Sequence, residues 1–163
     1  MFASSGLARA LLFFAVLCGG LVAGATFGIW QGYDPRALNA AAFVAVHQGA
    51  VRGLNVLLPV LGLIAILSIA ISAWLMRRER TVLWLLVAAL FCMVAAGSST
   101  RLFNQPINAE VMNWTADSVP NNWTDLRATW WQWHVARTVA AIVGFAFTVA
   151  AALWSSAEAH RKP

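Results

Sequence analysis

Two short runs of polar and aromatic residues could carry out chemistry in an otherwise apolar sequence. In the first run, Gln48, Arg52 and Asn55 are spaced i, i+4 and i+7, so they share one helix face, and His47 adjoins them. In the second run, a similar spacing relates basic, aromatic and hydroxyl residues: Arg127, Trp130, Trp131, His134, Arg137 and Thr138. Imidazole can accept a proton near neutral pH, and guanidinium can stabilise a developing oxyanion. Together these groups could supply a base and a stabiliser of negative charge.

Two asparagines could join these runs. Asn104 and Asn108 lie on either side of Pro106, at the start of the longest polar stretch between apolar segments. Polar groups flanked by membrane spans are costly unless they have a role, so this stretch is where a site should be sought. We expect the asparagines and both runs to meet at one end of a helix bundle, in a pocket rimmed by tryptophan.

The composition indicates a protein whose main solvent is lipid. Of the 163 residues, 61% are hydrophobic and 10% are charged, whereas soluble domains carry about 25% charged residues. The net charge of +5 does not indicate nucleic-acid binding, because the basic residues stand at the ends of apolar segments rather than on one polar face. We therefore expect contact with the lipid bilayer and no nucleic-acid partner.

Four apolar segments are each close to the roughly 20 residues that a helix needs to cross a bilayer. They are Leu7–Gln31, Leu54–Met76, Thr81–Arg101 and His134–Ser155. Inside lipid the backbone must satisfy its own hydrogen bonds, as a helix does. The sequence predicts an all-α fold with one domain over residues 1–163: an integral membrane four-helix bundle with a long outward loop over residues 102–133.

Three prolines predict where helices start and break. Asp34-Pro35 is a typical helix start, so the second helix should begin near Pro35, well before its lipid-buried part. Pro59 should kink that helix. Pro106 should end the third helix just beyond Asn104.

Basic residues predict the orientation in the membrane. Arg9 precedes the first span, Arg-Arg-Glu-Arg occupies residues 77–80 between the second and third spans, and basic residues follow the fourth span at 161–162. Four spans place these groups on one side, which the positive-inside rule makes cytoplasmic. With a composition rich in Ala, Arg and Trp, this predicts a multi-pass protein of the bacterial inner membrane with both termini cytoplasmic. We expect the first span to be retained rather than cleaved, because its apolar run continues through Trp30.

A spaced set of residues is similar to a family pattern. It reads Asn-x-Pro-Ile-Asn at residues 104–108, then Trp114 and Trp123, an Arg-x-x-Trp at residues 127–130, and finally Arg137. This layout resembles the anthrone-oxygenase-like family of small four-span membrane proteins. The resemblance implies a four-helix fold and, for a minority of members, oxygenation of a polycyclic aromatic ketone by molecular oxygen.

The first hypothesis is a cofactor-independent oxygenase for a hydrophobic aromatic or quinol-type substrate. Here His134 is the base and Arg137 the oxyanion partner, with His47 as a further catalytic candidate. The substrate would be bound by amides, guanidinium groups and aromatic rings: Asn104, Asn108, Trp130, Trp131, Gln48, Arg52, Asn55 and Arg127.

Two alternatives remain open. His47 and His134, on different helices at a similar predicted depth, could bind haem or form part of a copper or iron site. Alternatively, the chain could be a non-catalytic accessory subunit that binds a membrane partner or a second copy of itself. Its glycine ridge of Gly20, Gly24 and Gly28 would then supply the contact. Tryptophans as interfacial anchors, arginines that extend to the interface and hydrogen-bonded structural histidines would explain the same residues without a site.

Overall fold

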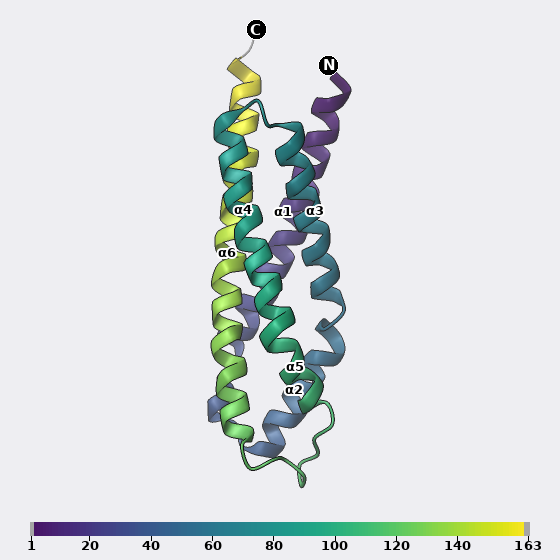
Figure 1. Ribbon diagram of the computed structural model, residues 1–163, viewed down its shortest axis with the longest axis vertical. Helices are drawn as coiled ribbons and strands as arrows, with labels where there is room; N and C mark the ends of the chain where they lie inside the picture. The colour runs from purple at the N-terminus through teal and green to yellow at the C-terminus, as the bar shows by residue number, and fades with distance from the viewer. Residues whose placement is uncertain (1, 162–163) are drawn as a thin grey trace.

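The fold is an all-helical antiparallel bundle. The computed structural model describes the backbone of residues 2–161 and the side chains of residues 6–157. The long helices α1 (Phe2–Gly32), α3 (Leu57–Leu75), α4 (Arg80–Ser99) and α6 (Trp123–Arg161) run along the length of the molecule (Figure 1). In the described chain, four helices are long and apolar enough to cross a membrane, which confirms the predicted fold class.

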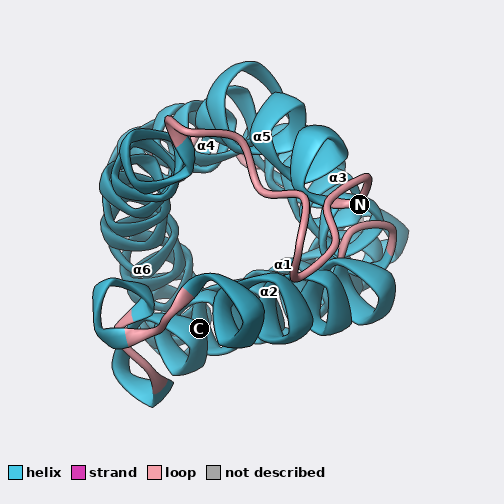
Figure 2. Ribbon diagram, turned by 90° about the horizontal axis from the view of Figure 1, so that it is seen from below, coloured by secondary structure: helices cyan, strands magenta, loops and turns pink. Residues whose placement is uncertain are grey.

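The long helices form a closed ring. α1 packs against α3 and α6, and α4 also packs against α3 and α6, as the end-on view of Figure 2 shows. Both ends of the described chain lie at one end of the bundle (Figure 1). The other end is built from shorter elements: the 3-10 turn η1 (Pro35–Ala37), α2 (Ala40–Leu54), the π-helical segment η2 (Thr100–Asn104) and α5 (Gln105–Val111).

The second helix starts later than the Asp-Pro pattern predicts. The Asp34 carboxylate accepts a hydrogen bond from the backbone N–H of Arg36, so it caps the short turn η1. α2 then begins at Ala40, where the side chain of Asn39 accepts from the N–H of Ala42. A second cap was available five residues on, and it starts the longer helix.

Pro59 interrupts the predicted second helix rather than kinking it. α2 ends at Leu54 and α3 starts at Leu57, with a turn at Asn55 and Val56. Proline has no N–H to donate to the carbonyl four residues earlier, here that of Asn55, and its ring crowds that carbonyl. The predicted single second helix is therefore two helices, and Asn55 sits at the junction.

The predicted outward loop is too long. The chain remains helical past residue 102 and becomes helical again at Trp123, so the non-helical part covers residues 112–122. Pro106 does not end the helix, because the wider turn of η2 precedes it: the N–H of Gln105 bonds to the carbonyl of Thr100, five residues back. The helix continues from η2 into α5. Asn104, the last residue of η2, and Asn108 on α5 are both buried.

Packing differs along the bundle. Towards the chain termini the core is aliphatic and includes Ile69, Leu86 and Met93, whereas at the α2–α5 end it is aromatic and includes Phe43 and Trp130. Small residues, Ala23, Ala96 and Ala141, join the two regions. The outer surface is apolar, as expected for helices that face lipid.

Only part of the predicted glycine ridge contacts another helix. An added Cβ at Gly20 would lie 3.1 Å from the Phe145 ring, whereas Gly24 and Gly28 are exposed, with nothing within 4 Å of an added Cβ. The tightest helix approach is at Gly144, where an added Cβ would lie 3.0 Å from Met93 Cγ and 3.2 Å from Cys92 Cβ.

We predict that Gly144→Leu destabilises the bundle by about 1–3 kcal/mol, because the added side chain has no room between α4 and α6. Reversible unfolding by SDS in mixed micelles measures this change. Gly24→Leu is the matched control, also a helical glycine, and should leave stability nearly unchanged. Equal stabilities of the two variants would contradict the packing described at Gly144.

Candidate functional site

A cavity of about 270 Å³ lies in the half of the bundle that contains α2 and α5. Five residues that the sequence predicted as site residues line it: His47, Asn55, Asn108, Trp130 and Arg137. Most of the remaining wall is apolar and comes from α1, α3 and α4. Residues of the two predicted polar runs therefore meet at the wall of one mostly apolar space.

Helical periodicity places these side chains. On α6, Trp130, His134 and Arg137 follow each other at i, i+4 and i+7, and Asn108 on α5 lies one turn after Asn104, the last residue of η2. The wide turn of η2 sets the register of α5, and wide turns of this kind occur frequently at functional sites.

Asn108 determines the protonation of His47. Its Oδ1 atom accepts a hydrogen bond of 2.8 Å from the indole N–H of Trp130, which can only donate, while its Nδ2 donates to Asn55 Oδ1 at 3.1 Å. The contact of 3.1 Å between His47 Nε2 and Asn108 Oδ1 must then have the imidazole as donor. His47 therefore carries its proton on Nε2.

His47 keeps a free ring nitrogen. Its side chain is only 1% exposed, and Nδ1 is buried without a hydrogen-bond partner. Burial lowers the pKa of His47, which lies on α2 outside the four candidate spans, to about 4. At neutral pH the protein thus holds a neutral imidazole with an unused lone pair on Nδ1, and the residue that carries it lines the cavity.

Arg137 presents a charge with no acidic partner. Its guanidinium donates to His134 Nδ1 at 2.9 Å and to Thr100 Oγ1 at 3.2 Å, and no carboxylate of the described residues forms an ion pair with it. Removing a charge from water is expensive unless a counter-charge compensates it. A half-buried guanidinium that lines a cavity with only neutral partners is therefore suited to bind an anion.

His134 holds Arg137 rather than facing the cavity. Its Nε2 lies 3.1 Å from the backbone carbonyl of Thr26, which can only accept, so the proton is on Nε2. Its Nδ1 accepts from Arg137. Both ring nitrogens are occupied, and His134 does not line the cavity.

Other predicted site residues bind the protein itself. Gln48 donates to the backbone carbonyls of Val111 and Trp114 and accepts from Arg52, which is exposed. Asn104 donates to the carbonyl of Trp130. None of these three predicted residues lines the cavity, and they connect α2, the end of α5 and α6.

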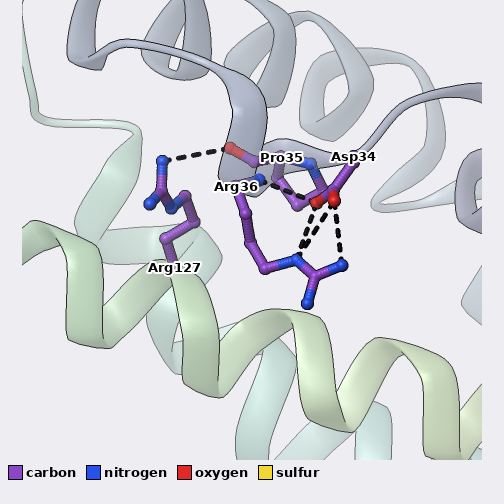
Figure 3. Close-up of polar contacts among 4 residues, drawn as sticks. All are labelled: Asp34, Pro35, Arg36 and Arg127. Carbon is purple, nitrogen blue, oxygen red and sulfur yellow. Dashed lines mark hydrogen bonds and ion pairs between the residues drawn. The ribbon is translucent and has the colours of Figure 1, made fainter.

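Arg127 connects the start of α6 to the segment between α1 and α2. Its guanidinium donates to the carbonyl of Pro35 at 3.1 Å (Figure 3). It also donates to the carbonyl of Leu38 at 2.9 Å and lies over the ring of Trp123. The neighbouring Arg36 pairs with Asp34 instead. Trp131 stacks near His134 and also does not line the cavity.

Sequence reasoning did not place four polar residues of the cavity wall in the site: Thr26, Thr100, Arg101 and Gln105. Thr100 donates to the carbonyl of Ala96 and accepts from Arg137. Gln105, half-buried, lies beside Pro106 in the Asn-Gln-Pro-Ile-Asn segment, so its neighbours were the available signal. The π-helical turn that brings Thr100 and Gln105 to the wall has no recognisable sequence pattern.

The alternative of a haem or metal site is based on His47 and His134. His47 keeps a free ring nitrogen, whereas both ring nitrogens of His134 have hydrogen-bond partners. Among the described residues, no group of three or more His, Cys, Asp or Glu side chains is placed to hold a metal ion.

Comparison with protein families identifies the family of this chain. The model of the anthrone oxygenase family matches residues 48–147, more than half of the chain. The chain belongs to the anthrone oxygenase family. The matched region contains Asn55, Asn108, Trp130 and Arg137, and it begins immediately after His47. No curated protein and no solved structure matches the chain significantly.

We predict that Asn108→Ala destabilises this member of the anthrone oxygenase family by more than about 2 kcal/mol. The change leaves the N–H groups of His47 and Trp130 without an acceptor, and each unpaired buried group costs about 1–3 kcal/mol. SDS unfolding measures it. The exposed Asn113, which bonds only to the carbonyl of Ala109, provides the control Asn113→Ala, and a cost equal to that control would contradict the network.

Proposed function

We propose that the protein is a membrane oxygenase that deprotonates a hydrophobic aromatic ketone or quinol and lets the resulting anion react directly with molecular oxygen. The observation that carries the proposal is the pair of groups in one cavity: a neutral imidazole with a free lone pair at His47, and a guanidinium without a carboxylate at Arg137. Membership of the anthrone oxygenase family supports the same chemistry.

His47 serves as the base in this proposal. The acidic C–H beside the carbonyl loses its proton to Nδ1, while Nε2–H stays bonded to Asn108. The low pKa of His47 makes it a weak base in the free protein. A developing enolate beside the ring favours the protonated imidazole and offsets the effect of burial.

Arg137 stabilises the oxygen of the enolate. Donors held in place before the reaction lower the barrier because they need no reorganisation as charge develops. His134 and Thr100 provide this fixed position, since each bonds the guanidinium from a different helix. His134 is accordingly assigned here as a positioning residue and no longer as the base, because both of its ring nitrogens are occupied.

The oxidation balances without a separate reductant. The enolate passes one electron to O₂, and the two radicals combine to form a C–O bond, giving a hydroperoxide once a proton is returned. Loss of the remaining C–H proton and cleavage of the O–O bond then release water and leave a second carbonyl group. For anthrone, C₁₄H₁₀O and O₂ give the quinone C₁₄H₈O₂ and H₂O. In this proposal His47 moves the protons.

The direct test measures oxygen uptake and quinone formation from anthrone by protein in lipid nanodiscs. The rate is corrected for spontaneous oxidation with heat-denatured protein, and metal content is measured on the same sample. We expect one O₂ consumed per quinone, at a rate independent of chelator. A rate equal to the background would overturn the proposal.

Paired asparagine variants separate the roles of the two histidines. Asparagine can accept a hydrogen bond from Arg137 but cannot take up a proton, so His134→Asn should retain kcat within about tenfold. His47→Asn should lower kcat by about 10²–10⁴. Binding of anthrone, followed by tryptophan fluorescence, should persist in both. A larger loss of kcat in His134→Asn than in His47→Asn would identify His134 as the base.

The acid limb of the pH profile provides a further prediction. Because kcat/KM reports ionisations of the free enzyme, it should stay level as the pH falls through 6.5 and drop only near the lowered pKa of His47, about 4. The drop occurs on the acid side because protonation removes the lone pair. Stopped-flow assays between pH 3.5 and 8 measure it, and a drop centred near 6.5 would exclude a buried His47 base.

A further inference from the structure

The exposed residues of the cavity wall all lie on one side. Of the lining residues, Pro59 and Leu63 on α3, Gly97 on α4 and Arg101 on η2 are exposed, while every lining residue on α1, α2, α5 and α6 is buried or half-buried. α3 and α4 are neighbours in the ring. The cavity therefore reaches the outer surface between these two helices.

The surface around this opening is apolar. Leu63 is 57% exposed, and Val60, Ile64 and Leu67 on α3 and Val94 on α4 are also exposed. Such a surface on a candidate span faces acyl chains rather than water. Arg101 is the one exposed charged residue among those that line the cavity, so the opening has one polar edge and is otherwise bordered by lipid-facing groups.

Gly97 leaves the opening unobstructed. An added Cβ there would have a single neighbour, Ile66 Cδ1 at 3.9 Å, so the position has space for a side chain that is not present. A larger residue at 97 would fill the space between α3 and α4 without displacing the backbone. Glycine at this position contributes little to packing, in contrast to Gly144.

We infer that the substrate enters the site sideways from the bilayer, through an opening between α3 and α4 at Gly97. The inference rests on the proposed function and specifies its substrate as a flat, membrane-dissolved aromatic compound with one ionisable oxygen. The ionisable oxygen of the substrate binds Arg137, and its aromatic rings contact the apolar wall formed by Leu58, Ile66 and Met93. The aqueous phase is not the source of this substrate.

Bulky substitution tests the route. In phosphatidylcholine nanodiscs, Gly97→Leu should slow the association of anthrone by about tenfold or more. Gly24→Leu, the matched change at an exposed glycine of α1 that lines no cavity, should leave it unchanged. Both variants should unfold at the same SDS fraction as the wild type. Association at the wild-type rate in Gly97→Leu would overturn the inference.

Cysteine labelling separates the route from the chemistry. In a background of Cys18→Ala and Cys92→Ala, the cysteines introduced by Gly97→Cys and Gly24→Cys are labelled with N-ethylmaleimide. Anthrone should protect the first and not the second, whether or not quinone is formed. Protection without turnover would support the route and refute the proposed oxygenase. Turnover with equal labelling in the presence and absence of anthrone would refute the route alone.

Discussion

The guanidinium of Arg137 is held inside an apolar bundle by an imidazole and a hydroxyl group instead of a carboxylate. This arrangement imposes the main physical constraint on the structure. A charge with neutral partners is tolerated only when several dipoles converge on it, so the acceptors His134 and Thr100 must themselves be fixed. The carbonyls of Thr26 and Ala96 fix them by accepting hydrogen bonds from the imidazole of His134 and the hydroxyl group of Thr100. The charge thereby stays available to a ligand, and a carboxylate in the same place would neutralise it.

A second hydrogen-bond network is centred on Asn108 and orients His47. It shares no hydrogen bond with the network around Arg137. The amide of Asn108 receives two N–H groups and donates to Asn55, which leaves one nitrogen of His47 unused. The two networks meet at the cavity from different helices, and Trp130 contacts both imidazoles. An imidazole that can take a proton and a guanidinium that can stabilise an anion therefore line the same cavity, and each is bonded to different partners.

The polar end depends on interruptions of regular helix. The break before Pro59 places Asn55 at a junction, and the wide turn before Pro106 brings Thr100 to the cavity wall. Non-helical backbone at such depth needs other partners, and side chains of the polar runs supply them: Gln48 caps the end of α5, and Arg127 binds the carbonyls at Pro35 and Leu38. Several residues that looked like substrate ligands thus stabilise the structure around the site.

The sequence by itself determined the class of fold and the end of the bundle that contains polar groups, because span length and composition are local properties that lipid enforces. It also predicted Arg137, His47 and Asn108 as site residues, and all three line the cavity. Only the tertiary structure decided which of the polar residues face the cavity. Helical spacing leaves His47 and His134 equivalent, and their difference arises from partners distant in sequence: Asn108 binds Nε2 of one, whereas Thr26 and Arg137 occupy both nitrogens of the other. Hydrogen bonds between helices determine which imidazole has a free lone pair, and the periodicity of a sequence does not predict these bonds.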